Sequence, residues 1–247
     1  KITSWRLIER MARKHSVVCL TFAHDADERA GAEELNARGI ETIAYPLNAR
    51  LAKLRSLPLL ISSKPLTLGV FGSRELQAEV LRRGAQADLA YAYSSSMCAF
   101  LEPLSIPKVM HFAELDSDKW RQYAERAAFP MSWLYARECR TLRAVEERLA
   151  AAAAENVLCT ALERQVFERE IPGRSSLVLR NGIDLAYYRP SPGTIEPGHV
   201  VFTGVMDYFP NVELTTHNGR QVRFYDDLPP RATGGLLRVP IDRVFTL

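Results

Sequence analysis

The sequence predicts an α/β fold in which a parallel sheet carries helices on both faces. Short apolar runs rich in β-branched residues alternate with amphipathic stretches of helical period. Residues 1–55 already follow the order helix, strand, helix, strand, helix, which is the rhythm of parallel α/β units. The chain of 247 residues, 47% of them hydrophobic, is also long enough to bury one large core or two modest ones.

The predicted helices are recognised by apolar positions at helical spacing and by residues that start or stop a helix. Asn48 and Ser73 are typical N-caps, Glu75 lies near the positive end of the helix that Ser73 starts, and Gly39 stops a helix. The sequence predicts helices over residues 1–15, 26–38, 48–55, 73–83, 117–127, 130–154 and 161–170. Residues 57–72 have no clear period, which predicts a loop or a short interfacial helix.

The predicted strands are short, apolar and bounded by turn residues. They cover residues 16–23, 40–45, 87–93, 109–115, 155–160, 177–180 and 199–203. Asn181-Gly182 after the sixth strand marks a tight turn. Residues 189–198 hold three prolines and two glycines and predict a linker. After the last strand only about 45 residues remain, whereas a second α/β domain needs about 100.

Composition narrows the class of protein. The net charge of +3 is too small to predict nucleic-acid binding, and four scattered cysteines without metal-ligand spacing are typical of thiols in a reducing compartment. No signal peptide or membrane span is evident, so we expect a cytoplasmic protein, either free or peripheral on the inner face of the cytoplasmic membrane. Basic residues 50–55 beside an apolar loop either contact anionic lipid or form a solvated helix face.

The leading site candidate is Asp116-Ser117-Asp118-Lys119-Trp120, which follows a predicted strand and starts a helix. Open α/β sheets bind ligands outside the carboxyl ends of their strands. Asp116 could cap the helix, with Asp118 in its first turn, or both carboxylates could contact a saccharide. A third interpretation is a metal-nucleotide site, because Asp-x-Asp carboxylates can hold a hard divalent cation. Trp120 is expected in the core.

Several nearby residues have a chemical and a structural interpretation. Glu114, at the same strand end, could orient a sugar hydroxyl or act as a base, or it is solvated. Ser94 and Ser95 could offer hydroxyls to a phosphate or sugar, or cap a helix. His111 could serve as a general base but lies inside a strand, which favours a core histidine. Glu138 is expected in a surface ion pair or in the wall of a cleft.

Four stretches together carry a family resemblance: DSDKWRQYA (Asp116–Ala124), PMSWLYARECRTL (Pro130–Leu142), NGID (Asn181–Asp184) and VFTGVMDYFPNV (Val201–Val212). With them the chain resembles family 4 glycosyltransferases of the GT-B architecture, especially the sugar transferases associated with exosortase (PEP-CTERM) and exopolysaccharide gene clusters. The similarity runs over residues 1–212.

The resemblance implies two Rossmann-like domains that face a cleft, here an acceptor-side domain at 1–188, a linker at 189–198 and the start of a donor-side domain at 199–213. It implies a retaining transfer of a hexosyl unit from a nucleotide-diphosphate sugar to a saccharide or lipid-linked acceptor, with no metal or other cofactor. It makes Glu114, Asp116 and Asp118 catalytic candidates on the acceptor side. The substrate-binding candidates are Ser94, Ser95, Lys119 and Asn181, and the donor diphosphate loop would hold Gly204, Met206 and Asp207.

The chain departs from the family at both ends. The family's opening strand and glycine-rich loop should precede Lys1, and the basic residues and paired glutamates that grip the donor are missing after Val212. Residues 214–247 form a divergent tail, whose first part weakly resembles the early hairpin of SenC-type copper-delivery proteins without their cysteine motif. We therefore expect a truncated transferase with little activity of its own. The alternative is a non-catalytic Rossmann-like binding module.

Overall fold

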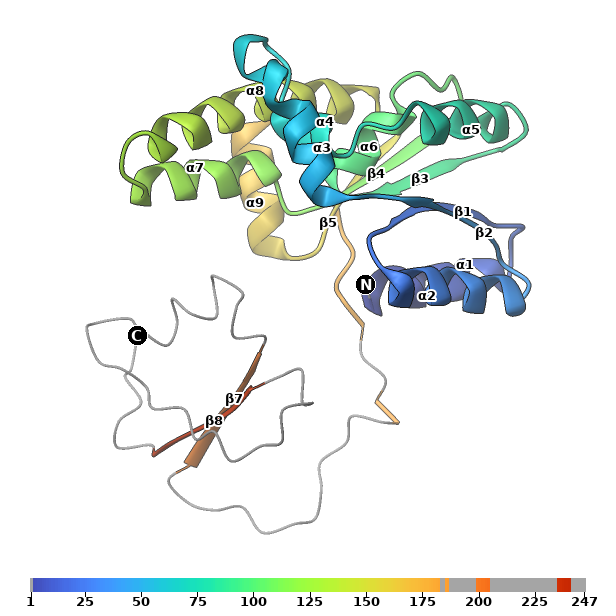
Figure 1. Cartoon of the computed structure of the whole chain (residues 1–247). Helices are drawn as coiled ribbons and strands as arrows, with labels where there is room; N and C mark the ends of the chain where they lie inside the picture. Colours follow the sequence, from blue (N-terminus) through green and yellow to red (C-terminus); the bar gives the residue numbers. More distant parts are fainter. Residues whose placement is uncertain (1, 183–184, 187–198, 205–234, 241–247) are drawn as a thin grey trace. The chain divides into compact units, whose positions relative to one another are not determined.

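The computed structural model describes residues 2–182, 185–186, 199–204 and 235–240. The chain divides into two compact units, residues 1–183 and 184–247. Unit 1 is an α/β unit in which parallel strands are flanked by helices (Figure 1), and this confirms the predicted fold class. None of the helices in the described part of the chain combines the length and the apolar character needed to cross a membrane.

Every described strand of unit 1 runs parallel to its sheet neighbours. A small sheet has the order β1-β2, and a larger one the order β3-β4-β5-β6. Parallel neighbours need a crossover connection, and each crossover in the larger sheet passes through at least one helix. All four carboxyl ends therefore meet at one edge of this sheet. The strands are β1 (Val18–Ala23), β2 (Glu41–Pro46), β3 (Ala90–Tyr93), β4 (Lys108–Ala113), β5 (Glu155–Leu158) and β6 (Leu177–Val178).

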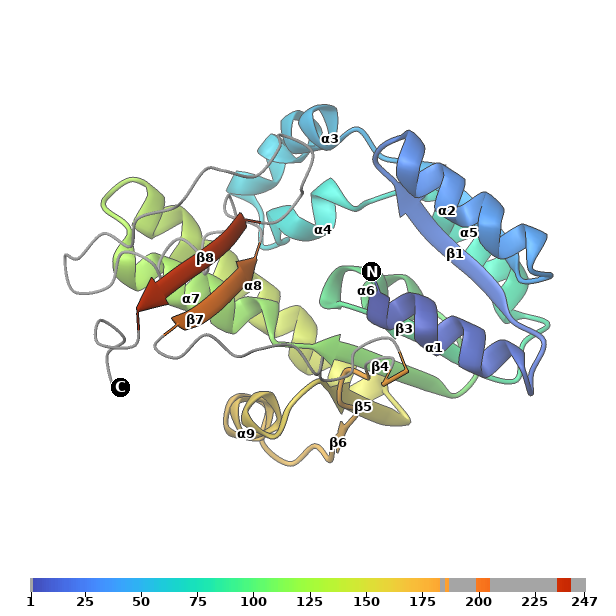
Figure 2. The same ribbon diagram turned by 90° about the horizontal axis from the view of Figure 1, so that it is seen from below.

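The helices of unit 1 begin close to where the sequence predicts. The side chains of Asp25, Asn48, Ser73 and Thr160 each accept a hydrogen bond from a first-turn amide and so cap α2, α3, α5 and α9. Helices α1 and α2 lie along one face of β1 and β2 (Figure 1), and Figure 2 shows the strands of the larger sheet from below. The α-helices are α1 (Ile2–Ala12), α2 (Ala26–Ala37), α3 (Ala49–Ser56), α4 (Leu66–Val70), α5 (Arg74–Gly84), α6 (Ser95–Leu101), α7 (Asp116–Arg126), α8 (Met131–Ala152) and α9 (Ala161–Glu170), with the 3-10 helix η1 at Leu57–Ile61.

The core of unit 1 is built around β4, which has a strand on each side. Its Phe112 is fully buried and stacks on Phe167 of α9, with ring centroids 5.8 Å apart. Leu142 and Leu149 of α8 are also fully buried. Each such side chain contributes about 1.5–3 kcal/mol when it leaves water. The strand that leads to the candidate turn at Asp116 is thus held firmly in place.

Residues 57–72, predicted as a loop or short interfacial helix, contain η1 and α4, which two charged side chains of α8 hold in place. Glu138 accepts hydrogen bonds from the amides of Leu66 and Thr67, at 2.8 and 2.7 Å, and so caps α4. The Nη1 atom of Arg137 lies 3.6 Å from the Oε2 atom of Glu138, and both side chains are buried. The prediction of a surface ion pair for Glu138 is therefore wrong. Their buried position follows from the backbone polar groups that they satisfy. The guanidinium of Arg137 donates to the carbonyls of Leu59, Leu60, Ser62 and Lys64.

In unit 2, β7 (His199–Gly204) pairs with β8 (Gly235–Pro240) in an antiparallel ladder. The predicted strand at 199–203 is therefore confirmed, and it extends by one residue to Gly204, which pairs with Gly235. The partner strand comes from the predicted tail. The predicted linker at 189–198 and the loop residues Met206 and Asp207 lie outside the described residues.

Candidate functional site

The candidate site lies at the carboxyl edge of the larger sheet. Ser94 follows β3, Glu114 and Asp116 follow β4, and Asn181 comes shortly after β6. Because these strands are parallel neighbours, their carboxyl ends bring residues from three distant stretches to one edge. The side chain of Cys159, which follows β5, lies 3.8 Å from the Oδ1 atom of Asn181. The topology thus places the predicted candidates of unit 1 at the carboxyl edge of the sheet.

Strained turns end β3 and β4 at this edge. Ala113 has a φ of 65° and Ser94 a φ of 77°, values that favour glycine. The amide of Glu114 donates to the carbonyl of Phe112 at 2.8 Å and closes a three-residue turn around Ala113. The amide of Ser94 donates to the carbonyl of His111, also at 2.8 Å. The turn at Ala113 ends β4 two residues earlier than predicted. Backbone conformations of this kind cost about 1–3 kcal/mol each.

A carboxylate, an ammonium and a second carboxylate lie together after the turn. Asp116 forms an ion pair with Lys119, whose Nζ is 3.8 Å from the Oε1 atom of Glu114. Burial alone would lower the pKa of Lys119, but Asp116 and Glu114 raise it, so the side chain stays charged. Glu114 is exposed. The N-cap of α7 is Leu115, so the interpretation of Asp116 as the cap is wrong, and Asp116 is the first helical residue.

Asp118 serves a different set of partners. Its carboxylate accepts hydrogen bonds from Arg121 Nε at 2.9 Å and from Gln122 Nε2 at 2.8 Å. Burial alone would raise the pKa of Asp118, but these hydrogen bonds and the charge of Arg121 lower it. Asp116 and Asp118 therefore form ion pairs with different residues, Lys119 and Arg121. Within the residues that the structure describes, no three His, Cys, Asp or Glu side chains are grouped so that they could hold a metal ion.

A buried carboxyl group, that of Glu146 on α8, connects the helices that begin at this edge. It accepts hydrogen bonds from the hydroxyl of Ser95 at 2.9 Å, from the amide of Ser117 at 3.2 Å and from the hydroxyl of Ser117. Arg143 Nε donates to the same Ser117 hydroxyl at 2.9 Å. Burial raises the pKa of Glu146 to about 7, although the serine hydrogen bonds oppose the shift. Glu146 therefore ties the first turns of α6 and α7 together, and Ser95 turns its hydroxyl inward.

A second buried cluster surrounds His111 on β4. The imidazole is fully buried, hydrogen-bonded to the hydroxyl of Tyr91 and packed 4.7 Å from the ring of Tyr93. This confirms the prediction of a core histidine. Burial lowers the pKa of His111 to about 4, and the thiol of Cys159, 3.5 Å from Nε2, has a pKa raised by burial. At neutral pH the pair is an imidazole beside a thiol, which is not the ion pair of a cysteine nucleophile.

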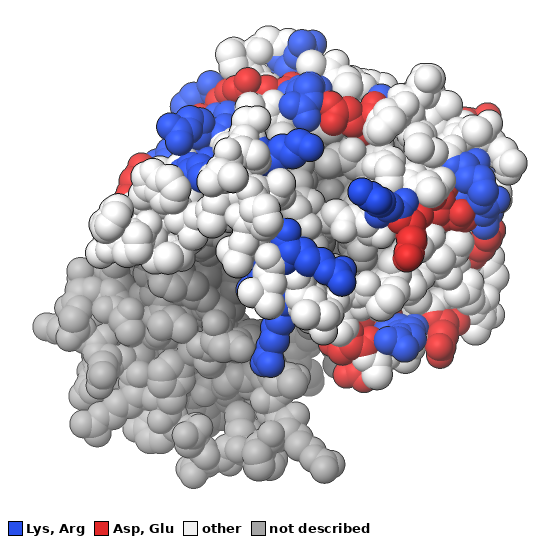
Figure 3. Space-filling view, turned by 45° about the horizontal axis from the view of Figure 1, so that its top comes forward, with Lys and Arg blue, Asp and Glu red and all other residues white. Residues whose placement is uncertain are grey.

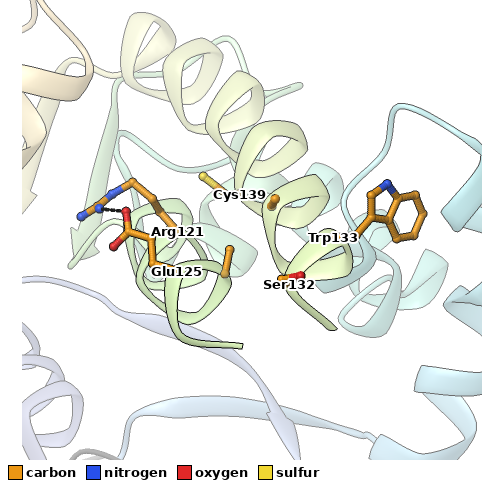
Figure 4. A pocket seen from close by; sticks show the side chains of 7 residues that line it. Arg121, Glu125, Ser132, Trp133 and Cys139 are labelled. Atoms are coloured by element: carbon orange, nitrogen blue, oxygen red, sulfur yellow. Dashed lines mark hydrogen bonds and ion pairs between the residues drawn. The ribbon is translucent and has the colours of Figure 1, made fainter. Parts of the chain in front are cut away.

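A pocket of about 460 Å³ opens between α7 and α8. In Figure 4, Arg121 and Glu125 pair on one side of it, and Trp133 projects from α8 away from them. None of the sequence-predicted candidates lines the pocket. One lining residue, Arg121, donates a hydrogen bond to the candidate Asp118. The lining residues are Arg121, Ala124, Glu125, Ser132, Trp133, Ala136 and Cys139.

The same two helices hold Trp120, which is half buried rather than fully in the core. Its ring packs against Tyr123 and Tyr135, with centroids 5.7 and 5.3 Å away. The aromatic cluster thus fixes α7 against α8 and leaves Trp120 as a structural residue. These contacts agree with a structural role for Trp120.

Comparisons with protein-family models, with curated proteins and with solved structures found no match for this chain. The residues of the carboxyl edge and their geometry are therefore the basis for any functional conclusion.

Proposed function

We propose that this chain is the acceptor-side part of a retaining glycosyltransferase that uses a nucleotide-diphosphate sugar. The reaction would transfer a hexosyl unit to a saccharide or lipid-linked acceptor in exopolysaccharide biosynthesis. The observation that carries the proposal is the polar turn from Glu114 to Lys119 at the carboxyl edge of a Rossmann-like sheet. The same turn begins DSDKWRQYA, the first of the stretches that resemble family 4 glycosyltransferases.

The charges of this turn suit a neutral polyhydroxyl ligand. Glu114, Asp116 and Lys119 together carry a formal charge of −1 and offer both acceptors and a donor at short range. A departing diphosphate needs preorganised positive groups instead. We therefore assign this edge to the acceptor saccharide. Glu114 would accept a hydrogen bond from a sugar hydroxyl, and Asp116 would orient Lys119. Ser94 and Asn181 would add contacts along the same edge.

The donor would lie against unit 2, where Gly204, Met206 and Asp207 remain the proposed diphosphate loop. The donor-gripping residues that the resemblance leads us to expect are missing from the sequence after Val212. We therefore propose little or no transferase activity for the chain alone.

A second candidate function is a non-catalytic binding module with the same fold. This function is favoured because the carboxylates near the edge are occupied by ion pairs or buried. Asp116 and Asp118 are both in ion pairs, and Glu146, whose pKa is about 7, is buried among serines rather than facing solvent. General acid or base catalysis needs a titrating group within reach of the substrate.

Calorimetric titration separates the two candidates. The purified chain would be titrated with neutral oligosaccharides of gluco, galacto and manno configuration, and separately with UDP-glucose and GDP-mannose. The proposal predicts binding of at least one oligosaccharide and none of the nucleotide sugars. Binding of nucleotide sugars without oligosaccharides would contradict the acceptor-side assignment, and failure to bind either class would favour the non-catalytic module. A robust donor-dependent transfer rate would contradict the predicted inactivity.

A further inference from the structure

We infer that the α3–η1 surface (residues 50–64) docks on anionic lipid bilayers together with Trp133, which lies one helical turn before Arg137 on α8. The inference rests on residues other than the candidates of the carboxyl edge and does not depend on the proposed function.

Large apolar side chains are unusually exposed on this surface. Leu51, Leu54 and Leu57 are 50%, 63% and 51% exposed, and Ile61 is 96% exposed. Single exposed hydrophobic residues are ordinary on protein surfaces, but four within eleven consecutive residues form a patch that calls for a partner.

The charge of the same stretch is entirely positive. Residues 42–73 contain no Asp or Glu but four basic residues, Arg50, Lys53, Arg55 and Lys64. None of the four forms an ion pair with any residue in the described part of the chain. This segment alone carries a charge of +4, whereas the whole chain carries +3. Figure 3, which brings the top of Figure 1 forward, shows some Lys and Arg side chains among uncharged residues and others beside Asp and Glu.

The backbone of η1 and of the turn after it is satisfied from inside the protein. Arg137 donates to four carbonyls between residues 59 and 64, and Glu138 accepts from two amides of α4. Polar backbone groups that lack water must find partners in the protein. Because these groups are already paired, η1 can enter an interface with little loss of hydrogen bonding, while the side chains of Leu57 and Ile61 are exposed.

Trp133 extends the apolar surface on the adjoining helix. It lies one turn before Arg137 on α8, and residues four apart share a helix face. The indole is 55% exposed, and Figure 4 shows it projecting away from Arg121 and Glu125. Tryptophan is the residue type that favours the boundary between lipid and water.

An anionic bilayer fits these observations better than a protein partner does. A second copy of this chain, docked through the same surface, would place four positive charges against four others. Anionic lipids supply the complementary charge and an apolar phase side by side.

The test is co-sedimentation of the full chain with vesicles of phosphatidylcholine alone and of phosphatidylcholine mixed with phosphatidylglycerol. We expect binding to the anionic vesicles, weakened by salt, and much weaker binding to the neutral ones. Ile61→Ser should lower the affinity about tenfold or more. Lys53→Gln should lower it about fivefold, because each basic residue at the surface contributes about 1 kcal/mol.

Two matched variants control for general effects. Leu162→Ser removes a leucine that is 66% exposed on α9, and Lys14→Gln removes an exposed charge after α1. Neither should change the affinity. No binding to anionic vesicles would overturn the inference, as would equal losses in the patch and control variants. Self-association that Ile61→Ser abolishes, without vesicle binding, would show that the partner is a second copy instead.

Discussion

Replacing Glu146 by glutamine should remove a pH dependence from the stability of unit 1. The carboxyl group is fully buried, and burial raises its pKa from an ordinary value of 4.5 to about 7. Between these values the folded protein keeps a proton that the unfolded chain releases. The free energy of unfolding therefore falls as the pH rises through this window, by about 1.4 kcal/mol per pH unit or about 3 kcal/mol in all.

Other groups contribute with the opposite sign. Burial lowers the pKa of His111 to about 4, so the stability that its neutral form provides is lost as the pH falls from 6.5 toward 4. The two effects overlap and largely cancel in the wild type. Because Glu146→Gln retains His111, the difference in unfolding free energy between variant and wild type isolates Glu146. That difference should move in favour of the variant by about 3 kcal/mol between pH 4.5 and pH 7.5.

Urea unfolding followed by tryptophan fluorescence measures this difference, because all three tryptophans of the chain lie in unit 1. Glu147→Gln is the matched control: it changes the next residue of the same helix, which is exposed, and its curve should run parallel to the wild type. Parallel curves for Glu146→Gln and wild type would refute the reasoning, because Glu146 would then titrate alike in the folded and unfolded chain.

Three further predictions concern the backbone and the core, each checked by urea unfolding. Ala113→Gly should raise the unfolding free energy by about 1 kcal/mol, because glycine adopts the φ of 65° without strain; a loss of stability would contradict this. Gly84→Ala would bring a Cβ within 2.4 Å of Leu104 Cδ2 and should cost about 1–3 kcal/mol, part of which Leu104→Val should restore. Arg137→Met leaves four carbonyls without their donor and should cost about 3 kcal/mol and speed trypsin cleavage between residues 53 and 64; wild-type cleavage rates would count against the anchor.

The elements that local pattern determines could be read from the sequence. Caps at Asn48 and Ser73 and the apolar runs at 109–115 and 155–160 place helices and strands within a few residues of where they lie. What failed depended on contacts far along the chain. The structure of residues 57–72 is set by Arg137 and Glu138, more than 70 residues away, and no local period records that dependence.

The position of the candidate site could be predicted from the sequence, but the buried hydrogen bonds of Glu146 were not predicted. Parallel topology brings Ser94, Glu114 and Asp116 to one edge, as the strand ends predict. The role of Glu146 was missed, although a signal was present: it shares the face of Leu142 and Leu149, at spacings of four and three residues. A carboxylate on an otherwise apolar helix face indicates a buried hydrogen-bond acceptor.

The central claim is that the carboxyl edge at Asp116 binds a saccharide acceptor. It is tested most directly by the affinity of Asp116→Asn for whichever neutral oligosaccharide binds the wild-type chain in calorimetry. Asp88→Asn is the control, because Asp88 is exposed just before β3, at the amino edge of the same sheet. Losing a charged acceptor and the partner of Lys119 should weaken binding at least about tenfold, since hydrogen bonds to charged groups contribute about 1.5–3 kcal/mol, while Asp88→Asn binds like wild type. Equal affinity for wild type and both variants would contradict the account.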